Sequence, residues 1–264
     1  MIVIAAIDES SGARVVLDVA KRLAALLGAQ VEAVHVRTKS SGGAVAAIAD
    51  AAQVPVSVRT GDIVAGLGSA VRERDAIALV IGSRDRPEGA APAGHIALDV
   101  VESLEGTIVV VPPDAADRPL RRVLVAVEGD GESAGLRRLL DHLGGRPLPE
   151  VIALHVIESA GLPPFADSPV LEADAFEDEL RIRVASGLLT DPTLIRFEMR
   201  VGDAAESLRE AIRELDVDLV VLAWHRDLSA GHGRLVREML ERGSIPVALF
   251  ALDDAESRRP ILRA

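Results

Sequence analysis

Polar residues and glycines that could bind an anion follow the apolar runs of this chain. Asp8 and Ser10 come directly after residues 2–7, and Gly82–Arg84 come directly after residues 77–81. Carboxylate and hydroxyl oxygens can hydrogen-bond a small polar ligand, and glycine lets backbone N–H groups approach an anion closely. These residue types at strand ends therefore predict a ligand-binding site.

Helix and strand patterns alternate along the chain and would place these residues at one edge of a sheet. The continuous, β-branched run 2–7 is typical of a strand buried on both faces. Ser10 or Ser11 would cap the next helix, which we expect to end at Gly28. The alternation predicts an α/β fold with a parallel sheet. The further strands of the first half are expected over residues 31–36, 54–59, 77–81 and 107–111.

The chain contains an internal repeat. Residues 70–85 return in altered form at 211–226, and the second copy carries a longer insert, 157–191, in which we expect a loop followed by a helix. The segment 112–119 between the copies begins with two prolines, which cannot join a strand ladder, so we interpret it as a linker. The repeat predicts two domains, residues 1–115 and 120–256.

The composition restricts the classes of function. With 264 residues, 49% of them hydrophobic, the chain is long enough to bury a substantial core. The absence of cysteine excludes disulfides and thiolate metal sites. A net charge of -12, a single tryptophan and no tyrosine disfavour nucleic acid as a partner. No apolar run has the length of a membrane helix and no basic signal segment precedes residues 2–7, so we expect a cytoplasmic protein with no membrane partner.

Each half resembles a universal stress protein (UspA) domain. The features are an Asp-Gly-Ser-like loop after the first strand, a His-Val end of the second, a Gly-Asp after the third and, in the first half, a Gly-Ser-Arg after the fourth. A glycine near the start of the last helix completes the pattern. The resemblance implies a tandem of five-stranded, doubly wound Rossmann-like sheets with strand order 3-2-1-4-5. It also implies ATP or AMP as a ligand, pairing of the fifth strands in an intramolecular pseudo-dimer, and association into homodimers.

The resemblance also implies which residues would bind the nucleotide. In the family, the phosphate loop reads Gly, two residues, Gly, nine residues, Gly and then Ser or Thr. Here Asp85 replaces the second glycine, the span to the third is one residue shorter, and a histidine replaces the Ser or Thr. A carboxylate repels a triphosphate, whereas a protonated histidine at a helix start attracts an anion. The implied binding residues of the first half are Asp8, Ser10, Val36, Gly82, Ser83, Arg84, Gly94 and His95.

The second half departs further from the same pattern. Glu128 and Asp130 replace the Asp and Ser of the first loop, and Ala-Trp-His-Arg at 223–226 replaces Gly-Ser-Arg-Asp. We expect Trp224 to lie at the mouth of the crevice and to fill space that a nucleotide would otherwise occupy.

The histidines allow more than one interpretation. His35 and His155 occupy equivalent strand ends, where a catalytic pair is conceivable, but we favour core residues because buried strand ends commonly hold satisfied histidines. His225 and His232 fit a phosphate-binding cluster, an incomplete metal pair or a loop that faces water.

The predicted function is a role in stress response or regulation through a bound nucleotide or partner. Two alternatives remain open: a protein-interaction module that binds no nucleotide, and a slow ATPase. We favour binding over turnover, because no positioned general base or nucleophile can be identified.

Overall fold

Two compact units make up the chain. The computed structural model describes residues 1–37, 44–83, 94–127, 149–157, 195–224 and 232–251. The first unit joins Met1–Leu120 to Arg226–Ala251, and the second joins Arg121–His225 to Leu252–Ala264. The sequence repeat divides the chain differently, into 1–115 and 120–256, and that domain division remains a prediction.

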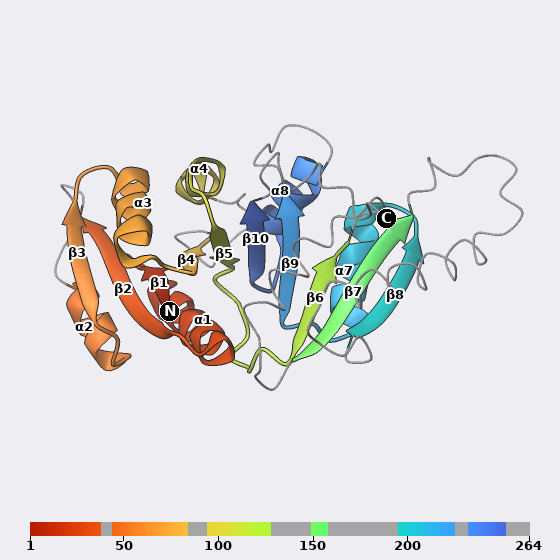
Figure 1. Ribbon diagram of the computed structural model, residues 1–264, viewed down its shortest axis with the longest axis horizontal. Helices are drawn as coiled ribbons and strands as arrows, with labels where there is room; N and C mark the ends of the chain where they lie inside the picture. The colour runs from red at the N-terminus through yellow and green to blue at the C-terminus, as the bar shows by residue number, and fades with distance from the viewer. Residues whose placement is uncertain (38–43, 84–93, 128–148, 158–194, 225–231, 252–264) are drawn as a thin grey trace, which may run out of the picture. The chain divides into compact units, whose positions relative to one another are not determined.

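The first unit contains a parallel sheet with the expected strand order. Its five strands follow the order β3-β2-β1-β4-β5, and each neighbouring pair is parallel (Figure 1). β10, the last strand of the second repeat, pairs antiparallel with β5, with Ala248 opposite Val109. This pairing explains why the contacts assign residues after 226 to the first unit. The strands are β1 (Ile2–Ala6), β2 (Gln30–Arg37), β3 (Val56–Thr60), β4 (Ala78–Gly82), β5 (Thr107–Val111) and β10 (Val247–Ala251).

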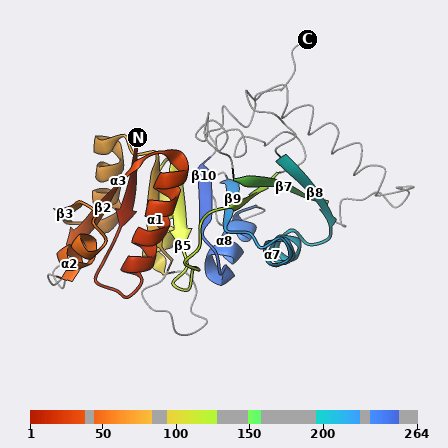
Figure 2. The same cartoon turned by 90° about the horizontal axis from the view of Figure 1, so that it is seen from below.

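Helices cover both faces of this sheet (Figure 2). Right-handed crossovers in this strand order place α1 and α2 on one face and α3 and α4 on the other, in agreement with the contacts of α1 with α2 and of α3 with α4. The fold is therefore doubly wound, as predicted. The helices of the unit are α1 (Ala13–Leu27), α2 (Ala44–Ala51), α3 (Ile63–Arg74), α4 (His95–Ser103) and α8 (His232–Arg242).

The structure confirms the predicted C-terminal end of α1 but not the predicted cap at its N-terminal end. Gly28 ends the helix with a φ of 58°, a left-handed conformation that glycine adopts without a steric penalty. At the other end the expected Ser10 or Ser11 cap is wrong, because Gly12 is the N-cap and no side chain caps the helix. Asp8 reaches the turn before α1, where its Oδ1 accepts a hydrogen bond from Ser10 N at 2.9 Å.

The second unit repeats four of the five strands of the first repeat. Its four strands are parallel in the order β9-β6-β7-β8, which corresponds to strands 4-1-2-3 of the first repeat. The expected insert begins at Ile157, which ends β7, and its remaining residues 158–191, with the expected helix, lie outside the described residues. The described elements are β6 (Arg122–Ala126), β7 (Glu150–Ile157), β8 (Ile195–Val201), α7 (Ala204–Glu214) and β9 (Leu219–Trp224).

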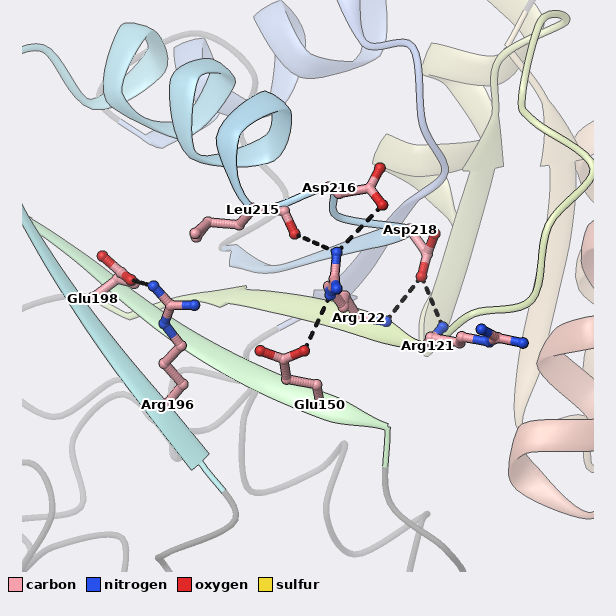
Figure 3. A network of polar contacts seen from close by, with 8 residues as sticks. All are labelled: Arg121, Arg122, Glu150, Arg196, Glu198, Leu215, Asp216 and Asp218. Carbon is pink, nitrogen blue, oxygen red and sulfur yellow. Dashed lines mark hydrogen bonds and ion pairs between the residues drawn. The ribbon is translucent and has the colours of Figure 1, made fainter.

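A polar network joins the starts of three strands in this second unit (Figure 3). The buried Asp218 accepts hydrogen bonds through Oδ2 from the backbone N of Arg121 at 2.8 Å and of Arg122 at 2.9 Å. The guanidinium of Arg122 pairs with Glu150 at 3.1 Å and with Asp216 at 3.3 Å. The network fixes the path by which the linker enters β6.

Every helix in the described ranges is too short or too polar to span a lipid bilayer.

Candidate functional site

A cavity lies at the carboxyl ends of β1, β2, β4 and β5 in the first unit. Its volume is about 160 Å³, and crevices at such strand ends are where open α/β sheets commonly bind ligands. Arg84, the remaining predicted site residue, lies outside the described residues. The predicted residues that line the cavity are Asp8, Ser10, Val36, Gly82, Ser83, Gly94 and His95.

The wall of the cavity is mostly aliphatic. Beside the predicted polar residues, side chains from α1, α3, α4 and the strand ends contribute apolar surface, which is the usual lining of a small-molecule site. Sequence reasoning missed these wall residues, because helical spacing marks them as core without showing which cavity they border. They include Val16, Ile63, Leu67, Ile81, Ile96 and Val100.

The loop after β1 brings two predicted polar residues to the cavity. Asp8 is exposed and Ser10 is half-buried, and the hydrogen bond between Asp8 Oδ1 and Ser10 N holds the loop in a tight turn. Behind this loop His35 is 5% exposed, and its Nδ1 lies 2.9 Å from the carbonyl oxygen of Ile7. The favoured interpretation of His35 as a core residue agrees with this burial.

The end of β4 and the start of α4 form the opposite side. Ser83 N donates to Val111 O at 2.8 Å, and Gly94 N donates to Ser83 O at the same distance. α4 begins with no side-chain cap on its first turn, so the positive end of the helix dipole and the first backbone N–H groups could receive an anion there. His95, its first residue, is exposed.

Two buried polar atoms of residues that line the cavity have no hydrogen-bond partner within the described part of the chain. They are Ser83 Oγ and His35 Nε2. Ser83 as a whole is 2% exposed. Buried polar groups are normally satisfied by protein, water or ligand. The cavity therefore has unmet hydrogen-bonding capacity for a polar molecule.

The linker between the repeats also borders the cavity. Pro112 and Pro113 line it, directly after β5. Farther along, Arg22 of α1 holds the linker through a hydrogen bond from Nη1 to Ala116 O at 3.0 Å and an ion pair with Asp117. The sequence identified this segment as a linker and gave no signal that it forms part of the cavity wall.

The second repeat differs at the equivalent strand end. Trp224 ends β9 in the position of Ser83 and is 2% exposed, so a large buried side chain stands where the first repeat has a small hydroxyl. His155 keeps the geometry of His35, with Nδ1 2.9 Å from Val127 O. His225 lies outside the described residues. Within the described ranges no group of three or more His, Cys, Asp or Glu side chains could hold a metal ion.

Comparison with known proteins places this geometry in a family. The model of the universal stress protein family matches residues 119–250, half of the 264-residue chain. The chain therefore belongs to the universal stress protein family. The match covers the second repeat.

Solved structures share the fold over nearly the whole chain. A protein of unknown function from Pseudomonas aeruginosa PAO1 aligns with a TM-score of 0.68 at 15% identity, over 97% of this chain and 94% of that one. A universal stress protein from Archaeoglobus fulgidus DSM 4304 aligns with a TM-score of 0.64 at 15% identity, over 95% of this chain and 98% of that one. No curated protein matches the chain. At these identities the structures establish the fold alone.

Proposed function

We propose that this protein binds one adenine nucleotide, AMP or ATP, in the cavity of the first unit and acts in stress response or regulation through that binding. The observation that carries the proposal is the convergence of seven of the eight predicted binding residues on one cavity, at the strand ends where α/β sheets bind nucleotides. The aliphatic wall suits a base, and the uncapped start of α4 suits a phosphate.

The cavity favours a nucleotide with few phosphates. Among its described lining residues the only side chains that can carry a positive charge are His35 and His95, and the overall charge is -12. A triphosphate carries more negative charge than two histidines and one helix terminus can balance. We therefore expect AMP to bind at least as tightly as ATP.

The second repeat is proposed to bind no nucleotide. Trp224 replaces Ser83 at the end of the equivalent strand and is buried. This observation supports a single nucleotide site per chain. The antiparallel pairing of β5 with β10 supports the proposed intramolecular pseudo-dimer of the two repeats. We also propose that the protein is cytoplasmic and that it acts by binding, without catalytic turnover.

Titration calorimetry with AMP, and with ATP and magnesium, tests the proposal. We expect a dissociation constant in the micromolar range with a stoichiometry near one. Gly82→Val adds a branched side chain to the cavity lining, which takes space from the ligand. We expect it to weaken binding by about tenfold or more, which corresponds to a loss of about 1.4 kcal/mol of binding free energy. The matched control is Ala223→Val, at the equivalent position of the second repeat, which should leave the affinity unchanged.

Three results would count against this function. The absence of heat with either nucleotide, together with a purified protein that carries none, would leave a protein-interaction module as the better account. Equal loss of affinity in Gly82→Val and Ala223→Val would place the binding elsewhere. Continued release of phosphate from ATP, well beyond one equivalent per protein, would favour the ATPase.

A further inference from the structure

The hydrogen-bond ladder between β1 and β2 ends in an unusual way. Ile7 N donates to Val34 O at 3.0 Å, and the regular parallel pattern would continue with a bond from Val36 N to Ile7 O. That bond is absent from the described residues. The imidazole of His35 takes its place, with Nδ1 2.9 Å from Ile7 O.

The contact fixes the tautomer of the ring. A carbonyl oxygen can only accept a hydrogen bond, so Nδ1 of His35 must be the donor, and in the neutral ring Nε2 carries a lone pair. The ring is 5% exposed and cannot reorient without breaking the packing around it. A buried, oriented donor therefore holds Ile7 O at the point where β1 ends.

The contact between His35 and Ile7 affects two backbone groups that border the cavity, those of Asp8 and of Val36. The Ile7 carbonyl and the N–H of Asp8 belong to one planar peptide group, so holding the oxygen also fixes the direction of the Asp8 N–H and the start of the Asp8 loop. Val34 and Val36 are two residues apart on β2, so their backbone groups point to the same side, toward β1. With Ile7 O held by the ring, the backbone N–H and C=O of Val36 have no backbone partner on that side among the residues that the structure describes.

We propose that His35 is a positioning residue for the nucleotide site: its side chain replaces one rung of the β1–β2 ladder, which frees the backbone edge of Val36 for a ligand and orients Asp8. This inference rests on the proposed function for its ligand and on the geometry of β1 and β2 for its mechanism. A free N–H beside a free C=O matches a planar group that presents an acceptor next to a donor, as the N1 and amino edge of adenine does.

The second repeat offers an internal control. His155 Nδ1 lies 2.9 Å from Val127 O, and Val127 N donates to Leu154 O at 2.8 Å, so the replaced rung is present there too. Loss of either imidazole should disturb the strand ends to a similar degree. Only the loss of His35 should affect a ligand in the cavity of the first unit.

The decisive experiment compares His35→Leu, His35→Asn and His155→Leu by calorimetry with AMP, beside chemical unfolding of each variant. Asparagine places an amide donor near the position of Nδ1, whereas leucine fills the space without a donor. We expect His35→Leu to weaken AMP binding about tenfold or more, His35→Asn to restore it to within about threefold, and His155→Leu to leave it unchanged. Equal affinity in His35→Leu and the unaltered protein, or equal loss in both leucine variants, would overturn the proposal.

A second measurement needs no ligand and keeps the inference separate from the proposed function. Nitrogen NMR of the imidazole rings should show a proton on Nδ1 of His35, and the amide of Asp8 should shift in His35→Leu more than in His35→Asn. A proton on Nε2, or an Asp8 amide indifferent to both variants, would overturn the positioning role even if AMP binds. If the tautomer is as expected and no nucleotide binds, the proposed function alone has failed.

Discussion

Asp62 and Asp203 occupy equivalent positions in the two repeats, and each caps the helix that follows the third strand of its repeat. Asp62 Oδ1 accepts a hydrogen bond from Ala65 N at 2.8 Å, and Asp203 Oδ1 accepts from Ala205 N and Glu206 N, both at 3.0 Å. The Gly-Asp pair after the third strand of each repeat therefore forms a turn followed by a helix cap. The preceding Gly61 and Gly202 have φ values of 120° and 150°, which suit glycine.

Asp62→Ala should lower the free energy of unfolding by about 1 kcal/mol, because the first turn of α3 loses its side-chain acceptor. Asp62→Asn keeps a capping oxygen and should cost only a few tenths of that. Urea denaturation monitored by circular dichroism measures both. An alanine variant as stable as the unaltered protein would show that water satisfies the Ala65 N–H equally well.

The site shows which residue-level features a sequence can predict. Asp8 and Gly82 were predictable because they follow apolar strand patterns, and Gly94 through the resemblance to the family pattern; all three line one cavity. The ring contact of His35 was not predictable, because it depends on the register of β1 against β2. The prediction of a Ser10 or Ser11 cap was wrong for a local reason. Ser10 lies in the turn before the helix, where its N–H binds Asp8 Oδ1 and its carbonyl oxygen accepts from Ala13 N.

At the scale of elements, ion pairs tie each outer strand to the helix that follows it. Arg59 of β3 forms two hydrogen bonds with Glu73 of α3, and Arg200 of β8 forms an ion pair with Glu214 of α7 through one hydrogen bond. The hydrogen bond from Arg59 and its positive charge lower the pKa of the Glu73 carboxyl below its ordinary value of 4.5. The same hydrogen bond raises the pKa of Arg59.

The stabilisation from this pair should depend on pH in one direction. Because the folded-state pKa of Glu73 is lowered, the contribution is fully present above its ordinary value of 4.5 and is lost as pH falls through the folded value. Glu73→Gln should therefore be slightly less stable than the unaltered protein at neutral pH and equally stable in strong acid. The difference should shrink in high salt, because both groups reach solvent.

Glu214→Gln is the matched variant for this measurement. Arg200 keeps a second partner, Glu210, at 3.6 Å, so the loss should be smaller than for Glu73→Gln. A stability gap that persists unchanged at low pH would show that the glutamine acts through packing and not through charge.

At the scale of the whole molecule, β10 covers the edge of β5 that a single repeat would expose. Leu249 of β10 lies opposite Ile108 of β5, and both side chains are buried. An uncovered apolar edge strand presents unpaired backbone groups and readily pairs with another chain. The pairing of the fifth strands therefore protects the most apolar edge of the first repeat.

A fragment of residues 1–120 should consequently associate with itself. It retains β1 to β5 and the cavity residues, but it lacks β10, so its β5 edge is free. Sedimentation velocity should show an apparent mass that rises with fragment concentration. A fragment that stays monomeric at high concentration would contradict the expectation, provided that its circular dichroism shows it to be folded.

The fold could be predicted further than the division into units. The run 107–111 was expected as a strand and is β5 at the same bounds, and the strand order of the first repeat is confirmed. Buried parallel strands can be predicted because their sequences are continuous apolar runs rich in β-branched residues. The assignment of β10 to the first unit follows from long-range pairing, which no local pattern contains.

The joining of β5 and β10 within one chain has a consequence for symmetry. Two strands on the same chain meet at an effective concentration on the order of millimolar, so this pairing does not depend on how dilute the protein is. In a homodimer of identical domains, every substitution appears in both copies. Here the position that is Ser83 in one repeat is Trp224 in the other. A covalent tandem can therefore carry a buried tryptophan at one strand end and a small hydroxyl at the equivalent end of the other repeat.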